Sequence, residues 1–408
     1  MRICVIGAGV IGVSTAYMLG RLGHDVTVLE KAPKVAAGTS EANGAQLSYS
    51  YVEPLAGPGT LKQLPKYMMG LDPAIHFGFS FKPDYLSWGL KFIGNCRQSK
   101  FSQNYKRRLA LAAYSQEVLQ IIQQEISKTA LEGTGKGKLV LVKSRRSLDH
   151  IKDKFDRHNK TSLSLDRLSR DACIDIEPAL ASWTGEFAGG LYGAQDVALD
   201  TQIFCETLKD SSEKNFGVVY LFDSEVLRIE ELSKTQRSVV TDQGKFQCDA
   251  VVICTGHKNN QLLKSLSLSL PAYPMQGYSL TLPVKDTVAK CSITDSHHKI
   301  VFASLGDAVR IAGFMDANLP QSKTMKRCQQ LHELARSLWP DIADFNANPH
   351  YWSGFRPMVP SGVPVIKETR VEGIYLNGGH GSLGYTFALG SAMQIANMIG
   401  HEQRNKFG

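Results

Sequence analysis

The first thirty residues carry apolar runs and turns in an order that predicts a strand, a helix and a second strand. Residues 2–6 are β-prone and apolar, and residues 10–22 place apolar side chains at helical spacing before Gly23. A glycine there is a common helix C-cap, and short continuous apolar runs are typical of buried parallel strands. Residues 25–29 form a second such run, which ends in Glu30. This order argues against a membrane anchor or a signal peptide, because glycines and charges interrupt the apolar run and a strand pattern follows it.

The next part of the chain predicts loops and a long helical region. Residues 38–48 are small and polar, which favours a loop and the start of a helix. Residues 54–73 hold several prolines and glycines and predict an irregular excursion. Residues 83–128 carry apolar positions at spacings of three and four, which predicts mostly helix.

The second half of the chain returns to strands. Residues 250–254 form a continuous apolar run before Thr255 and Gly256, which predicts another buried parallel strand that ends in a glycine turn. Residues 273–315 alternate between apolar and polar side chains and predict an antiparallel sheet. Residues 373–400 read as a strand, a glycine loop and a helix of small residues. We expect this last strand to return to the N-terminal sheet.

The three glycines at the first turn have the G-x-G-x-x-G spacing of a dinucleotide site. Gly7 allows the sharp turn, Gly9 lets the backbone approach a pyrophosphate, and Gly12 lets the helix pack closely on the strand. The helix N-terminus offers free N–H groups to the phosphates. Glu30 stands near the position where a carboxylate accepts hydrogen bonds from a ribose, which also argues against NADP. A ligand-free glycine turn is the alternative, but strand, helix, strand and acid in this order favour a dinucleotide.

Composition narrows the class of protein. A chain of 408 residues suits two domains or one large composite. The net charge of +8 is scattered, which favours solvated helix faces over attraction to anionic lipid or carboxylate substrates. Nucleic acid is not an expected partner, because no binding motif accompanies the charge. The eight cysteines stand singly without zinc spacing, which predicts no metal site and a reducing compartment.

Several motifs in a fixed order add a resemblance that covers nearly the whole chain. They are "VIGAGVIGVSTAYML", "TSEANGAQLSYSYVEPLAGPG", "YPMQGYSLTLP", "VRIAGFMD", "WSGFRPMVPSGVPVI" and "LNGGHGSLGYTFALGS". The chain resembles the FAD-dependent amine and amino-acid oxidoreductases, which include D-amino-acid oxidase, glycine oxidase and sarcosine oxidase. Within them it is most similar to the small subunit of bacterial D-amino-acid dehydrogenase. The resemblance implies FAD, held non-covalently, and oxidation of a D-amino acid to an imino acid that hydrolyses to a 2-oxo acid and ammonia.

The resemblance also implies a fold and a set of cofactor contacts. The fold is a Rossmann-like FAD-binding domain from residues 1–60, 185–262 and 350–408, with a substrate domain of mostly antiparallel sheet and helices from residues 61–184 and 263–349. The expected FAD-binding residues are Gly7, Gly9, Val10, Ile11, Gly12, Glu30, Lys31, Thr39, Ser40, Asn43, Gly44, Gln46, Leu47, Val226, Thr255, Gly256, Gly379, His380, Gly381, Ser382, Leu383 and Gly384.

Six residues are candidates for the substrate site. Arg356 lies in "WSGFRPM", and a guanidinium there can grip a carboxylate with two parallel hydrogen bonds, unless it serves a structural ion pair. The other five candidates each have a structural alternative. A tyrosine can be a core residue, the histidine can stabilise its loop, and the second arginine can occupy an exposed strand position. They are Tyr278, Tyr49, Tyr51, His380 and Arg310.

The chain departs from the family pattern at three positions, where Gln276 replaces a lysine, Ser361 replaces an acid and Ser304 stands near an expected arginine. We expect these changes to touch the substrate face.

The leading hypothesis is a D-amino-acid dehydrogenase that passes electrons to a quinone. We expect it to be cytoplasmic and in peripheral contact with the inner membrane through "IHFGFSFKPDYLSWGLKFIG", a stretch that could equally be packed core. The alternatives are an oxidase that uses O₂ on glycine, sarcosine, D-proline or hydroxyproline, and a flavoprotein subunit without its own chemistry.

Overall fold

The computed structural model describes residues 1–126, 131, 135–233, 235–285 and 288–407. Its first sheet has the strand order β18-β19-β12-β1-β2-β8. Neighbouring strands in this order run parallel, except for the antiparallel edge pair of β18 and β19. The strands are β1 (Arg2–Ile6), β2 (Asp25–Leu29), β8 (Val219–Leu221), β12 (Ala250–Ile253), β18 (Val365–Glu368) and β19 (Ile374–Gly378). The predicted return of the last strand to the N-terminal sheet is confirmed.

Both faces of the first sheet are covered. Ile3 and Val5 of β1 pack into a core with the helices α1 (Val10–Arg21), α8 (Thr201–Phe216) and α11 (Gly384–Phe407). Cys4 and Ile6 point to the other face, where they meet an antiparallel sheet of β9 (Val226–Glu231), β10 (Arg237–Thr241) and β11 (Lys245–Cys248), with α9 (Asn259–Ser265) beside it. The alternation along β1 explains why this strand is a continuous apolar run.

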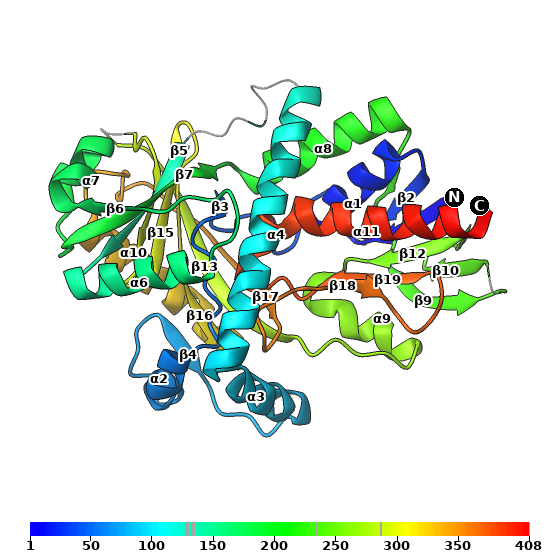
Figure 1. Cartoon of the computed structure of the whole chain (residues 1–408), viewed down its shortest axis with the longest axis horizontal. Coiled ribbons are helices and arrows are strands. Elements are labelled where there is room, and N and C mark those ends of the chain that lie inside the picture. The colour runs from blue at the N-terminus through cyan, green and yellow to red at the C-terminus, as the bar shows by residue number, and fades with distance from the viewer. Residues whose placement is uncertain (127–130, 132–134, 234, 286–287, 408) are drawn as a thin grey trace.

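The second sheet is larger and mostly antiparallel, with the order β17-β13-β16-β15-β14-β5-β7-β3. Its strands are β3 (Gln46–Leu47), β5 (Gly135–Val142), β7 (Gly189–Ala198), β13 (Tyr273–Pro283), β14 (Ser292–Asp295), β15 (Ile300–Ser304), β16 (Ala308–Ala317) and β17 (His350–Met358), with β4 (Ile75–Phe77) and β6 (Asp166–Ser169) paired beside them. One face packs on α10 (Thr324–Leu338), α7 (Arg170–Ile176) and Trp339. The opposite face looks toward the first sheet (Figure 1).

Helices join and flank the two sheets. The long helix α4 (Gln98–Glu125) runs between them and packs on α11, while α6 (Arg145–His158) lies against the second sheet. The short helices α2 (Pro58–Met68) and α3 (Pro83–Asn95) form a separate lower lobe in Figure 1. None of the described helices is long and apolar enough to cross a membrane.

Two local predictions differ from the structure, and a third is confirmed. Residues 38–48 contain no helix start: Ala45 has a φ of 51°, outside the right-handed helical region, and Gln46 then pairs with Ala198 of β7. Residues 54–73 hold the helix α2, because Pro58 occupies its first turn, where a proline is tolerated. The prediction that residues 83–128 are mostly helical is confirmed by α3 and α4, which are separated at Cys96 and Arg97, and positions 127–128 lie outside the described residues.

The strands also cross the predicted domain ranges. β7 lies within the range 185–262 and β17 within 350–408, yet both belong to the second sheet. Their backbones bond to β5 and β13, whose residues were placed in the other domain. The fold class stands as expected, and the domain division stays a prediction, because strand pairings define sheets rather than domains.

Candidate cofactor and substrate site

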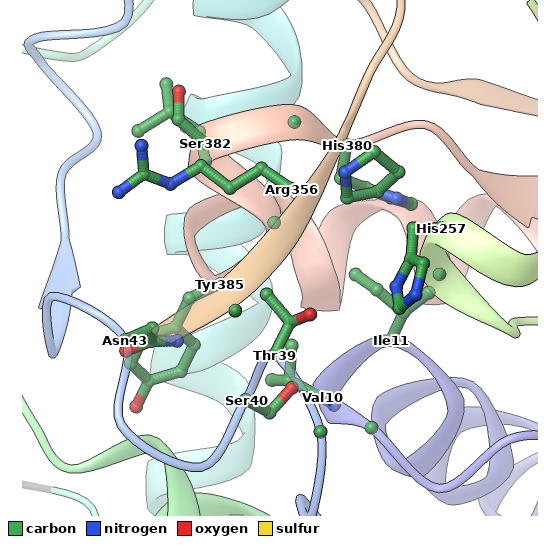
Figure 2. Close-up of a pocket in the computed structure, with 18 of the residues that line it drawn as sticks. Val10, Ile11, Thr39, Ser40, Asn43, His257, Arg356, His380, Ser382 and Tyr385 are labelled. Carbon is green, nitrogen blue, oxygen red and sulfur yellow. Dashed lines mark hydrogen bonds between the residues drawn. The ribbon is translucent and has the colours of Figure 1, made fainter. Parts of the chain in front are cut away.

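A cavity of about 830 Å³ lies between the two sheets. Its lining comes from the turn after β1, the loop 37–48, the turn after β12, the loop 378–385 and the inner face of the second sheet. Figure 2 shows that Arg356 from β17, His380 and Ser382 from the glycine loop, and Thr39 and Ser40 from the loop 37–48 gather around this one space. Segments from both ends of the chain therefore build a single site.

The turn after β1 has the geometry that its glycines predicted. Gly7 has a φ of 100°, and a Cβ there would come within 2.9 Å of the Cys254 carbonyl oxygen. A Cβ on Gly12 would overlap the carbonyl oxygen of Gly7, so Gly12 serves the close packing of helix on strand and does not line the cavity. Gly9, Val10 and Ile11 do line it. The first turn of α1 leaves N–H groups without intrahelical acceptors, as an anion site requires.

The acid at the end of β2 is fixed by the same turn. Glu30 accepts hydrogen bonds from the Ala8 N–H at 2.7 Å and from the Ala32 N–H at 2.9 Å. Each carboxylate oxygen keeps a further lone pair for a ribose hydroxyl. Lys31 also lines the cavity, and its amine lies close enough to Lys258 to lower the pKa of that lysine.

The loop after β2 is held by its own polar side chains. The Ser40 hydroxyl accepts the Val10 N–H at 3.0 Å, and the Thr39 hydroxyl donates to the Phe355 carbonyl at 2.9 Å. Asn43 Oδ1 accepts from the Ala45 N–H and from the Thr201 hydroxyl, at 2.9 and 2.7 Å. These contacts fix the loop across the cavity, with Gly44 and Gln46 on its lining. The predicted Leu47 is instead buried in the core.

The glycine loop after β19 lies on the opposite wall. Gly379 and Gly381 have φ values of 75° and 62°, which glycine adopts without strain, and all of Gly379–Gly384 line the cavity up to the first residue of α11. His380 is buried, and its Nε2 lies 3.1 Å from the Ser391 hydroxyl. Burial lowers the pKa of His380 to about 3, so this imidazole is neutral and braces the loop against α11.

Arg356 stands on β17 at the cavity wall. Its Nη1 donates to the Phe314 carbonyl at 2.9 Å, and its guanidinium occupies the space over Gly277, where any Cβ would overlap it. Burial lowers the pKa of Arg356. Among the described residues, no carboxylate lies within ion-pair distance of it, so the structural ion-pair alternative has no support. Arg356 is half-buried, and a guanidinium at a cavity wall without an acid partner can bind an anionic ligand.

The backbone beside Arg356 is strained where it meets that guanidinium. Phe314 has a φ of 59°, next to a register shift between Gln276 and Tyr278, and its carbonyl is the acceptor for Arg356. A non-glycine residue in this conformation costs about 1–3 kcal/mol and marks functional sites. The ring of Phe314 is held by Arg327, whose Cζ lies 4.3 Å from the ring centroid.

The other substrate candidates divide into two groups. Tyr278 and Tyr51 line the cavity, but the Tyr278 hydroxyl donates to Asp316 at 2.8 Å, and Asp316 is also paired with Arg327. Tyr49 and Arg310 do not line the cavity. Tyr49 packs in the core, the alternative weighed for it.

Arg310 was expected on the substrate face or at an exposed strand position, and neither placement is right. It is buried, and it donates to Thr281 Oγ1 at 2.6 Å, to the Asn43 carbonyl at 3.1 Å and to Asp200 Oδ2 at 3.2 Å. It therefore ties the loop 37–48 to the second sheet and to the N-cap of α8.

Replacing Arg310 with methionine should destabilise the fold by about 3 kcal/mol, because Asp200 is left partly buried without its partner. Urea unfolding measures this loss. We expect a much smaller effect on the rate of substrate oxidation than for Arg356. A large loss of rate in a fully stable variant would instead place Arg310 in the substrate site.

Comparison with known proteins decides the family. A family model described as FAD dependent oxidoreductase matches residues 2–398. The chain belongs to this family. It is 33% identical over 402 residues to a D-amino acid dehydrogenase of Vibrio atlanticus, covering 98% of this chain and 96% of the relative. It is 34% identical over 411 residues to D-amino acid dehydrogenase 2 of Ralstonia nicotianae, covering 98% and 96%.

Solved structures agree on the fold of this FAD-dependent oxidoreductase. Glycine oxidase from Geobacillus kaustophilus superposes with a TM-score of 0.70 at 18% identity, covering 98% of this chain and 95% of that one. L-amino acid deaminase from Proteus vulgaris gives 0.72 at 13% identity, covering 98% and 93%. The expected cofactor is therefore FAD.

The lining residues fit FAD on independent grounds. Gln46 Nε2, Asn377 Oδ1 and the Tyr385 hydroxyl are buried polar atoms for which no hydrogen-bond partner is found among the described residues, and all three residues line the cavity. Buried polar atoms need partners, and the polar edges of FAD can supply them. Val226, Thr255 and Gly256, which were expected to contact FAD, line the same cavity as Glu30.

The three departures from the family pattern do not reach the cavity wall. Gln276 donates to the Thr324 hydroxyl at 3.1 Å and to the Ser353 hydroxyl at 3.3 Å, and Ser361 bonds within its own turn. Ser304 is buried in β15. None of the three lines the cavity, so the expectation that they touch the substrate face is not supported.

Sequence reasoning missed several lining residues. Arg108 and Lys138 lie in segments that read only as a helix and a strand, and Trp352 only as a neighbour of Arg356. His257, whose ring centroid lies 5.4 Å from that of Phe355, follows directly after the Thr255–Gly256 turn. For His257 the glycine turn was an available signal. The cavity face of β5 could have been read only with the strand pairings in hand.

Proposed function

We propose that this FAD-dependent oxidoreductase oxidises D-amino acids at Cα to imino acids, which water then converts to 2-oxo acids and ammonia. The observation that carries the proposal is the half-buried Arg356 guanidinium at the cavity wall, near the glycine loop and without a carboxylate partner among the described residues. The D-amino acid dehydrogenases that resemble this chain over nearly its whole length support the same substrate class. FAD, held non-covalently in this proposal, would be the acceptor for the hydride that leaves Cα.

In this proposal the protein binds and orients the amino acid. The Arg356 N–H groups that do not bond to Phe314 hold the substrate carboxylate. Asp316, which is paired with Arg327, also accepts a hydrogen bond from the Tyr278 hydroxyl. These bonds keep this part of the wall rigid. A fixed carboxylate leaves the substrate few orientations, which is the main contribution that positioning makes to such a reaction.

The opposite wall controls charge in the same reaction. N–H groups of the loop Gly379–Gly384 and the N-terminus of α11 favour negative charge at the cavity surface. His380 is neutral and stabilises the loop through its contact with the Ser391 hydroxyl. It therefore carries no positive charge and takes up no proton at neutral pH. The substrate amine has to be neutral before the hydride leaves, and this mechanism assigns that proton to water.

Steady-state turnover tests the proposed function. The FAD-loaded protein, a panel of D- and L-amino acids and an artificial electron acceptor should yield ammonia and 2-oxo acid with D-isomers only. Products from L-isomers at equal rates would contradict the proposal. Turnover of glycine, sarcosine or D-proline alone would favour the imino-acid alternative, and no turnover at full FAD loading would favour a non-catalytic subunit.

We further propose that the electrons pass to a quinone at the cytoplasmic face of a membrane. The stretch from Ile75 to Gly94 is only partly core: Phe77, Trp88 and Phe92 are buried, but Phe79, Phe81 and Leu90 are 74%, 94% and 74% exposed. Leu71 and Met69 are exposed in the same lobe of α2 and α3. Exposed apolar side chains beside lysines suit the surface of an anionic bilayer, where quinones reside. The eight buried free cysteines suit a reducing compartment.

Replacing Phe79 and Phe81 together with serine should lower binding to anionic vesicles about tenfold or more, because two exposed aromatic side chains no longer enter the bilayer. Vesicle co-sedimentation measures this, and turnover with a water-soluble acceptor should not change. Equal binding of the variant and the parent protein would contradict membrane contact through this lobe. Reoxidation in air as fast as with a quinone would favour the oxidase alternative.

A further inference from the structure

A second guanidinium lines the cavity away from Arg356. Arg108 of α4 is 5% exposed, and its Nη1 donates to the Gly362 carbonyl at 3.0 Å. Its Cζ lies 5.5 Å from the ring centroid of Phe387, and no hydrogen-bond partner of its Nε is found among the described residues. Arg108 lines the cavity, has an N–H without a partner among the described residues and has no carboxylate beside it. Such an arginine is suited to bind an anion.

A buried lysine lines the same cavity. Lys138 of β5 is 5% exposed, donates to the Ser48 hydroxyl at 2.8 Å and lies 5.4 Å from the centre of the Tyr51 ring. Burial lowers the pKa of Lys138 to about 8. Arg108 and Lys138 both act on the segment Ser48–Leu55, whose residues 48, 51, 53 and 55 line the cavity. Lys138 contacts Ser48 and Tyr51, and the charge of Glu53 acts on the pKa of Arg108.

Nearby acids do not neutralise this pair of cations by direct contact. Glu53 is held by Lys154 at 2.7 and 2.8 Å, and Asp196 accepts from the N–H groups of Tyr49 and Ser50 and from the Ser50 hydroxyl. Among the described residues, no carboxylate oxygen lies within 4.0 Å of the charged nitrogens of Arg108 or Lys138. The phosphates of FAD have a different site, at the glycine turn before α1 on the first sheet.

We propose that Arg108 and Lys138 form a second anion subsite, which binds a carboxylate at the end of the substrate side chain. With Arg356 holding the α-carboxylate, the enzyme would then prefer D-amino acids with acidic side chains, such as D-glutamate, over their neutral isosteres. This inference rests on the proposed function for its reaction, but the subsite itself needs only the cavity and its two cations.

The test compares D-glutamate with D-glutamine, which has nearly the same shape without the charge. Anaerobic reduction of the FAD-loaded protein should be about 10- to 100-fold more efficient with D-glutamate, the discrimination expected of hydrogen bonds to a charged group. Arg108→Met should lower that ratio by about tenfold or more. Arg107→Met removes the same charge from the exposed neighbour on α4 and should leave the ratio unchanged. A parent protein that prefers D-glutamine, or an Arg108→Met ratio equal to that of the parent, overturns the subsite.

A binding measurement separates this inference from the proposed function. Glutarate should perturb the visible spectrum of the bound flavin at lower concentration than butyrate, and Arg108→Met should remove that advantage. Thermal unfolding and FAD content should show that the variant is folded and loaded. If no D-amino acid reduces the flavin while glutarate still binds through Arg108, the proposed reaction fails and the subsite stands. If D-amino acids react but glutarate and butyrate bind equally, the subsite fails and the reaction stands.

Discussion

Arg356→Met is expected to lower the second-order rate constant for reduction of the bound flavin by substrate by about 10²- to 10⁴-fold, with FAD content unchanged. The reason is that this half-buried guanidinium, once the substrate covers it, binds the carboxylate through charge-assisted hydrogen bonds, and removing one partner of such a covered pair costs about 3–5 kcal/mol. Methionine fills much of the space over Gly277 that the guanidinium occupies, so the wall should keep its shape. Stopped-flow mixing with a D-amino acid under anaerobic conditions measures the loss.

Arg356→Lys is the matched control for this prediction. A lysine keeps the positive charge but loses the planar fork, so part of the rate should return. The loss should appear mainly in the apparent affinity for substrate, because the carboxylate is not the reacting group. Unchanged kinetics in Arg356→Met would mean that the carboxylate binds elsewhere and would remove the basis of the proposed function.

Gly12→Ala is expected to abolish FAD binding and to leave little folded protein. A Cβ on Gly12 would overlap the carbonyl oxygen of Gly7, which is backbone and cannot move without displacing α1 from β1. Forced overlap in a packed interior costs several kcal/mol, a large share of the roughly 5–15 kcal/mol that stabilises a typical domain. The flavin absorbance of the purified protein and the yield of soluble chain measure the effect.

Two other glycines provide the controls. A Cβ on Gly9 would meet only the Ser40 hydroxyl, at 3.4 Å, so Gly9→Ala should fold but bind FAD more weakly, because the new methyl group faces the phosphates. Gly59 in α2 has open space around it, and Gly59→Ala should be neutral or slightly stabilising. A Gly12→Ala protein that is as yellow and stable as Gly59→Ala would contradict the account of this turn.

The parts of the fold that local backbone chemistry controls could be predicted from the sequence. The turn at Gly7, the helix after it and the acid at Glu30 follow from residues within thirty positions of one another. The helix α2 was missed because Pro58 was taken as a breaker, although a proline at a first turn begins a helix. The strand β3 was missed because its partner, β7, lies about 150 positions later in the chain.

The cavity wall was predicted less completely, for a physical reason. Arg310 and Arg356 both lie on strands of the second sheet, and sequence alone cannot say which long side chain reaches a cavity and which meets an acid such as Asp200. Arg108 and Lys138 read as ordinary charged positions on a helix and a strand, because their burial results from packing against distant segments. Motifs pointed to the cofactor, whereas the buried charges on the cavity wall appeared only in three dimensions.

The most direct test of the central claim is the visible spectrum of the purified protein under anaerobic conditions. We expect a yellow protein whose flavin absorbance, at about 450 nm, bleaches on addition of D-amino acids and not of their L-isomers. Bleaching that depends on the D-configuration and disappears in Arg356→Met would support both the reaction and its anchor. A yellow protein that no D-amino acid bleaches, or one that L-isomers bleach equally well, would contradict the account.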